Sequence, residues 1–91
     1  MSRAFTERNV VPRIRRAKVP EAVLRHLLQR IRDREIPTSA LQVFAAWADK
    51  NPEVPPGKWF KRFSQMTVCG EGELVLTFLI PKQTAVGKEV V

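Results

Sequence analysis

The stretch of sequence that decides the fold is Glu73-Leu74-Val75-Leu76-Thr77-Phe78-Leu79-Ile80. Its even-numbered residues are all apolar and share one face of the predicted strand, while the odd-numbered residues take the other face. Because both faces are largely apolar, such a strand is expected in the middle of a sheet or covered by a partner. Pro81 follows directly and ends the strand.

Two further strands are expected beside this one. Residues 65–69 predict the first, with Met66 and Val68 on one side. The two glycines of the segment 70–72 supply the positive φ angles of a turn between the strands. Residues 84–91 predict a third, weaker strand, in which Gly87 forms a bend or bulge.

The first of two predicted helices begins at Pro20 and Glu21, which both suit the first turn of a helix. Apolar residues then recur at three- and four-residue spacing up to Ile31, as on one side of an amphipathic helix. The helix is expected to end near residue 34 or 35, because Pro37 disfavours helical geometry at the residue before it.

The second helix is predicted from Ser39, which has Gln42 three residues later in the spacing of a capping box. Asn51 and Pro52 provide the stop. The short link between the two helices predicts an antiparallel helical hairpin.

Residues 58–63 alternate cationic and aromatic side chains in a way that leaves two interpretations. Trp59 and Phe63 lie four apart, which suits one helical turn that adds to the core. The same composition is found in surfaces that stack single-stranded nucleic acid. We favour the core, because two Trp and five Phe are the only aromatic residues available to a small domain.

The expected fold is therefore α+β: an antiparallel two-helix hairpin packed on a small antiparallel two- or three-stranded sheet, with a basic N-terminal arm. Residues 1–9 are expected to be a disordered tail, and residues 10–91 a single small α+β domain, in line with a length of 91 residues. Residues 10–18 leave two alternatives open, an extended arm and a short edge strand, since Pro12 is tolerated in an edge strand.

The charge is strongly positive and unevenly distributed. Sixteen Lys and Arg against nine Asp and Glu give a formal net charge of +7. Six of these cations and only one acid, Glu7, fall within residues 1–18, so this fifth of the chain carries a net +5. Arginine predominates there, and its guanidinium group binds phosphate and carboxylate in a bidentate manner.

Several kinds of chemistry are excluded or disfavoured. One cysteine excludes an intrachain disulfide framework, and one cysteine with one histidine excludes a zinc site built from Cys and His in one chain. Cys69 and His26 are the only residues that could form a nucleophile–base pair. We interpret them as a buried thiol and a solvated histidine, because nothing nearby lowers the thiol pKa. Glu71 and Glu73 argue against a phosphate-binding loop at residues 69–73. No catalytic residue, metal or cofactor is predicted.

The sequence therefore predicts a small, basic, non-enzymatic nucleic-acid-binding accessory protein that contacts the phosphate backbone with little sequence specificity. The residues expected to contact phosphates are Arg13, Arg15, Arg16, Lys18, Arg25, Arg30, Arg32 and Arg34. The alternative is a protein-interaction module or homo-oligomeric subunit that pairs through a sheet edge or the apolar second helix. A cytoplasmic location is expected, with no membrane partner, because the apolar run 74–80 is too short to span a bilayer.

A third interpretation rests on the expected order of elements. If residues 10–18 form a strand, the order strand, helix, helix and antiparallel strands resembles that of the small RelE/ParE-type toxins, which are basic and of similar length. The ribonuclease members use basic residues with a Tyr or His near the C-terminal strands. This chain has no Tyr, and its single histidine, His26, lies on the first predicted helix. The resemblance therefore implies no ribonuclease activity here.

Overall fold

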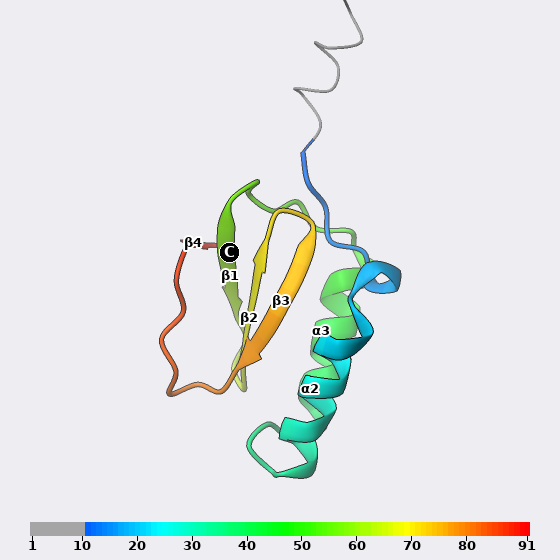
Figure 1. The fold of residues 1–91 in the computed structure, drawn as a ribbon, viewed down its shortest axis with the longest axis vertical. Helices are drawn as coiled ribbons and strands as arrows, with labels where there is room; N and C mark the ends of the chain where they lie inside the picture. The colour runs from blue at the N-terminus through cyan, green and yellow to red at the C-terminus, as the bar shows by residue number, and fades with distance from the viewer. Residues whose placement is uncertain (1–10) are drawn as a thin grey trace, which may run out of the picture.

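The computed structural model describes residues 11–91, so the tail predicted at residues 1–9 lies outside the described residues. Within residues 11–91 the chain forms an α+β fold of two α-helices and a four-stranded mixed open sheet (Figure 1). In chain order the elements are a 3-10 helix η1 (Arg16–Lys18), helices α2 (Glu21–Arg32) and α3 (Ser39–Asp49), and strands β1 (Lys58–Arg62), β2 (Thr67–Glu71), β3 (Leu74–Leu79) and β4 (Lys88–Glu89).

The sheet has the order β3-β2-β1-β4. Strands β2 and β3 form the predicted antiparallel hairpin, although Gly70 lies within β2 and the turn begins at Gly72, whose φ is +56°. The helical turn predicted at residues 58–63 is wrong. Residues 58–62 instead pair antiparallel with β2 along their whole length. The spacing of Trp59 and Phe63 could not distinguish a helical turn from a strand, because these residues form a strand only through pairing with β2, which lies further along the chain.

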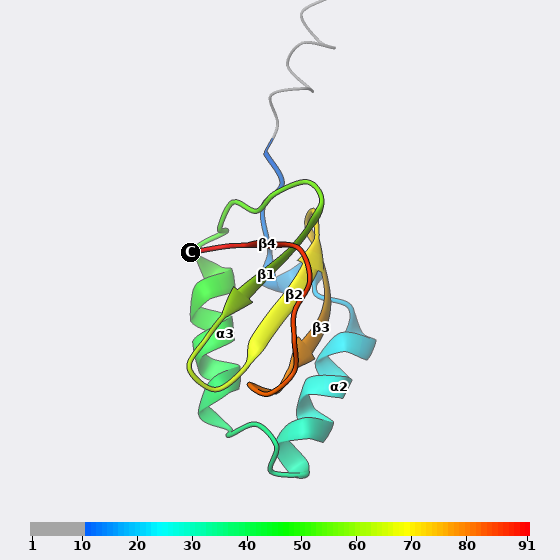
Figure 2. The ribbon, with the colours of Figure 1, turned by 90° about the vertical axis from the view of Figure 1, so that its left-hand side faces the viewer.

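Strand β4 makes the sheet mixed. The predicted antiparallel sheet of two or three strands is therefore wrong in number, and the predicted direction holds for β1, β2 and β3 but not for β4. β4 pairs parallel with β1, and the amide of Val90 donates to the carbonyl oxygen of Phe60 at 2.7 Å. Parallel pairing requires a crossover connection. Residues 80–87 provide it by passing over the outer face of the sheet, on the side away from the helices (Figures 1 and 2).

Strand β3 is an edge strand, so of the two situations expected for it, in the middle of the sheet or covered by a partner, the central position is wrong. One of its faces meets the helix side of the sheet, where Val75 and Phe78 are buried. Its other face is covered only in part, and Leu74 and Leu76 remain 45% and 43% exposed. The crossover segment covers part of that face. The predicted common face of the even-numbered residues is wrong, because a register shift between Cys69 and Gly70 puts Val75 and Phe78 on the same side.

Both helices lie against the same face of the sheet and run in opposite directions (Figure 2). The core between the helices and the sheet contains aromatic pairs. The rings of Phe44 in α3 and Phe78 in β3 meet edge to face with centroids 5.1 Å apart, and those of Trp47 and Trp59 are 5.9 Å apart. Aromatic pairs in this distance range add attraction beyond the area they bury. The preference for a core role of the aromatic residues at 58–63 is confirmed for Trp59, which is fully buried.

The stop signals predicted for the helices agree with the structure, whereas the capping box predicted for the second helix does not. Two residues after the last residue of each helix the backbone is in the left-handed region, at Arg34 with φ 64° and at Asn51 with φ 49°. The amide of Glu35 donates back to the carbonyl of Arg30 at 2.9 Å, which closes the end of α2. The capping box at Ser39 is wrong: Thr38 is the residue that precedes the helix, and no side chain caps it.

Residues 11–15 are extended and attached to the proline-rich link before β1. Ile14 donates to the carbonyl of Pro52 at 3.0 Å, Val54 donates to that of Pro12 at 2.9 Å, and Ile14 is fully buried. Only an isolated bridge between Arg13 and Glu53 forms, so residues 11–18 contain no strand of the sheet. The order of elements on which the resemblance to RelE/ParE-type toxins depends is therefore not found in the described residues.

Candidate nucleic-acid interface

The predicted phosphate-contacting residues fall into two groups at opposite ends of α2. Arg13, Arg15, Arg16 and Lys18 lie in or next to η1, just before the N-terminus of α2. Arg30, Arg32 and Arg34 lie at its C-terminus, and Arg25 lies between the groups. A twelve-residue helix is about 18 Å long, so the two groups are too far apart to contact one phosphate.

Four of these cations are held by carboxylates. Nη2 of Arg13 lies 2.7 Å from Oε2 of Glu53, and its Nη1 donates to the carbonyl of Asn51 at 3.0 Å. Arg13 therefore anchors the extended segment to the link before β1. Arg16 and Asp49 form a looser pair at 3.2 Å, which connects η1 to the end of α3.

The other two ion pairs lie along α2. Arg25 meets Glu21 at 3.3 Å, four residues earlier on the exposed side of the helix. The Arg30 guanidinium meets Glu35 at 3.3 Å and donates from Nε to Nε2 of His26 at 3.2 Å. The Arg30 side chain is only 17% exposed, so it contributes more to the end of the helix than to a binding surface.

The remaining four cations are available for a ligand. No carboxylate of residues 11–91 lies within 4.0 Å of the charged groups of Arg15, Lys18, Arg32 or Arg34. All four residues are exposed. The described structure thus separates the eight predicted residues into four paired and four free ones, with two of the free ones at each end of α2.

Arg32 and Arg34 line a hollow of about 560 Å³ at the corner where α2 turns toward α3. Gln65, from the loop between β1 and β2, and Thr38, from the link before α3, also line it. Neither Gln65 nor Thr38 is among the residues predicted from the sequence. No local pattern marks either of them, because only the folding of the sheet against the helices brings Gln65 to this corner.

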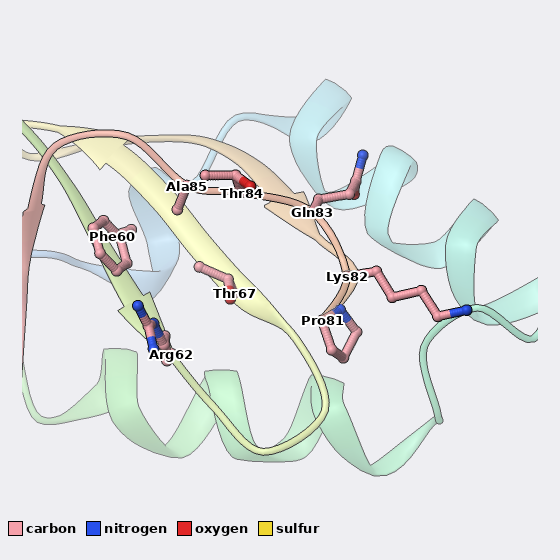
Figure 3. Close-up of a pocket in the computed structure, with 8 residues that line it drawn as sticks. All are labelled: Phe60, Arg62, Thr67, Pro81, Lys82, Gln83, Thr84 and Ala85. Atoms are coloured by element: carbon pink, nitrogen blue, oxygen red, sulfur yellow. The ribbon is translucent and has the colours of Figure 1, made fainter.

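A second hollow, of about 320 Å³, lies on the outer face of the sheet beneath the crossover segment (Figure 3). The Arg62 guanidinium stands 5.5 Å from the centre of the Phe60 ring and 3.7 Å from a carboxylate oxygen of Glu89. Thr67 lies in the middle of the hollow, whereas Lys82 extends away from it (Figure 3). Arg62 is therefore partly neutralised, and this hollow offers less positive charge than the corner of α2.

Cys69 and His26 do not form a catalytic pair. Cys69 lines a hollow with Thr84–Val86 of the crossover segment, on the outer face of the sheet. His26 lies on α2, which covers the opposite face, and it accepts a hydrogen bond from Arg30. Burial raises the pKa of the Cys69 thiol, so a smaller fraction of it is the reactive thiolate at neutral pH. The sheet separates the two residues.

No group of three or more His, Cys, Asp or Glu side chains in residues 11–91 is arranged to hold a metal ion. In the same part of the chain, no helix combines the length and the apolar character needed to cross a membrane.

Comparison of the chain with known protein families, with curated proteins and with solved structures finds no match.

Proposed function

We propose that the protein is a non-enzymatic accessory protein that binds nucleic acid through contacts with the phosphate backbone. The observation that carries the proposal is the set of four exposed cations without a carboxylate partner in residues 11–91: Arg15, Lys18, Arg32 and Arg34. A net charge of +7 adds a long-range attraction for polyanions. The proposal includes the basic N-terminal arm and the cytoplasmic location expected from the sequence.

The arrangement of these cations favours backbone contact over recognition of bases. They form two pairs at the two ends of one helix, separated by about 18 Å. Phosphates follow one another along a strand, so one strand lying along α2 would meet both pairs. Because phosphate contacts carry no sequence information, we expect similar affinities for different sequences.

The proposal is tested by fluorescence anisotropy with short single-stranded RNA, single-stranded DNA and duplex DNA across a salt titration. Four phosphate contacts predict a slope of about −2.8 for log Kobs against log[salt] on a single strand. The variant R15Q/K18Q/R32Q/R34Q should bind at least tenfold more weakly at low salt and show a much flatter slope.

A matched control removes the same amount of charge from the sheet and the crossover segment. The variant K58Q/K61Q/K82Q/K88Q replaces four lysines on β1, on the crossover segment and on β4. It should retain more of the affinity than the first variant. Equal losses in the two variants would mean that only net charge matters, and no binding of any probe at low salt would reject the proposal.

A second candidate function, self-association through a sheet edge, is favoured by a different observation. Strand β3 is a free edge of the sheet, it contains no charged residue, and Leu74 and Leu76 are partly exposed on it. An uncharged edge strand of six residues offers unpaired backbone groups to another strand. Two copies paired through β3 would form one continuous sheet.

Light scattering over a range of protein concentrations tests this candidate. Dimer formation that is abolished by Leu76→Lys would support it, because a charge on the edge opposes strand pairing. A monomer at all concentrations up to the millimolar range would reject it. The variant Val43→Lys, which places a charge on the exposed side of α3, is the control.

A further inference from the structure

We propose that the hollow at the corner of α2 and α3 binds the terminal phosphate of a nucleotide, and that this is the site where a nucleic-acid strand end is held. The inference rests on the proposed function and makes it more specific. It concerns Arg32 and Arg34 with Gln65 and Thr38, which line a space of about 560 Å³. Small-molecule sites commonly have volumes of this size.

The charge of the hollow matches a phosphate monoester better than a phosphodiester. A monoester near neutral pH carries close to two negative charges and three oxygens that are free to accept hydrogen bonds. Two guanidinium groups without carboxylate partners in residues 11–91 supply two positive charges and donors in a planar fork. Glu35 also lines the hollow, but its carboxylate is paired with Arg30 at 3.3 Å.

The surroundings of the two arginines supply the other contacts that a nucleotide needs. Ile31 and Pro37 line the hollow and offer an apolar surface to a base or a sugar. The amide of Gln65 and the hydroxyl of Thr38 can each donate and accept hydrogen bonds. One unit of a strand, with its terminal phosphate, therefore finds both kinds of contact in this hollow.

The backbone at Arg34 gives an independent reason to look for a role of this side chain. Its φ of 64° lies in the left-handed region, where helices usually end on glycine and where a residue with a Cβ atom is strained. Glycine would fit this position with less strain, yet the chain has an arginine there. Strained residues of this kind cluster at binding sites.

The experiment compares two oligonucleotides of the same sequence, one with a 5′-phosphate and one with a 5′-hydroxyl, by fluorescence anisotropy. We expect the phosphate to increase the affinity at least threefold, and R32Q/R34Q to abolish this difference. The matched variant R15Q/K18Q should weaken the binding of both probes by the same factor and leave the difference intact. Equal binding of both probes by the wild type, or a difference that survives in R32Q/R34Q, overturns the inference.

A second experiment distinguishes a failure of this inference from a failure of the proposed function. Adenosine 5′-monophosphate and inorganic phosphate are titrated into the full chain, and the amide resonances are followed by NMR. Saturable shifts confined to residues 31–38 and 65 support the site even if no oligonucleotide binds, in which case only the proposed function fails. Shifts with adenosine monophosphate but not with a strand end identify a free nucleotide as the ligand, and no shift with either probe overturns the site.

The variant Arg34→Gly distinguishes binding from folding. It removes the guanidinium while relieving the backbone, so its melting temperature should be no lower than that of the wild type, whereas the preference for the 5′-phosphate should fall at least threefold. An unchanged preference in Arg34→Gly would show that Arg34 does not contact the phosphate.

Discussion

The indole ring of Trp59 occupies the space beside Gly70 that a side chain would need. The two residues face each other across β1 and β2, and a Cβ atom at residue 70 would lie 2.7 Å from Cε2 of Trp59 and 2.7 Å from the carbonyl oxygen of Leu74. The indole Nε1 then donates to the carbonyl of Gly72 at 2.8 Å. Two glycines of the β2–β3 hairpin thus position a fully buried tryptophan: Gly70 leaves room for its ring, and the carbonyl of Gly72 accepts its hydrogen bond.

Gly70→Ala is therefore expected to destabilise the protein by about 1–3 kcal/mol, the range typical of inserting atoms into a packed core. For a domain of this size, each kcal/mol lowers Tm by about 4–8 °C. Thermal melts followed by circular dichroism measure the effect. Gly57→Ala is the matched control: nothing lies within 4 Å of its added Cβ, and Tm should change little. Equal effects in the two variants would contradict the packing of Trp59 on Gly70.

Gly87 allows β4 to approach β1. Its φ is +115°, and a Cβ atom there would lie 2.6 Å from the carbonyl oxygen of Lys58. Gly87→Ala should therefore release residues 88–90 from β1 while the rest of the sheet stays folded. Hydrogen exchange should be faster at the amide of Val90, which donates to Phe60 at 2.7 Å.

The reactivity of Cys69 gives a second measure of the same change, because this thiol lies beneath the crossover segment. Its labelling by a maleimide should be faster in Gly87→Ala than in the wild type under native conditions. The variant Lys88→Ala keeps the glycine and should behave as the wild type. Unchanged exchange and labelling in Gly87→Ala would show that β4 does not depend on Gly87.

Substitution by glycine after the two helices should change the free energy of unfolding by different amounts. Arg34→Gly should stabilise the protein by about 0.5 kcal/mol, since relief of the left-handed strain exceeds the lost attraction between the cation and the helix C-terminus. Asn51→Gly should gain less, because asparagine tolerates positive φ better than arginine does. Urea unfolding of both variants measures the difference. A larger gain at residue 51 than at residue 34 would contradict this explanation.

Burial of the Cys69 thiol predicts a loss of stability in alkali. Its pKa is raised by desolvation above the ordinary value of 9.0, so the unfolded chain loses this proton first as the pH rises. The contribution of the thiol to stability is therefore complete below pH 9.0 and decreases as the pH rises toward the folded-state pKa. The chain has no tyrosine to titrate in the same range.

Urea unfolding at pH 8, 9 and 10 tests this for the wild type and Cys69→Ala. The free energy of unfolding should fall more steeply with pH in the wild type than in the variant. Parallel curves would show that the thiol has the same pKa in the folded and unfolded states.

The eight predicted cations of the candidate interface differ in ways that their sequence positions do not show. Counting charges along the sequence identified all eight, but it treated each of them as an equally good phosphate contact. Arg13 and Glu53 lie 40 residues apart in the sequence, and the fold brings their charged groups to 2.7 Å. The distinction between cations that hold the structure together and cations that are free for a ligand therefore depends on contacts between distant segments.

The sequence by itself determined the elements whose signals are local. Apolar residues at three- and four-residue spacing predicted both helices, because this period depends only on backbone geometry. The apolar run 73–80 predicted the strand β3 but not its faces, because the register shift against Cys69 and Gly70 buries Val75 and Phe78 together and leaves Leu74 and Leu76 exposed. The tertiary structure alone decided that residues 58–62 form a strand, that β4 pairs in parallel with β1, and that Arg32 and Arg34 share a hollow with Gln65. Each of these depends on a partner far along the chain, and pairing between distant segments leaves no periodic signal in either of them.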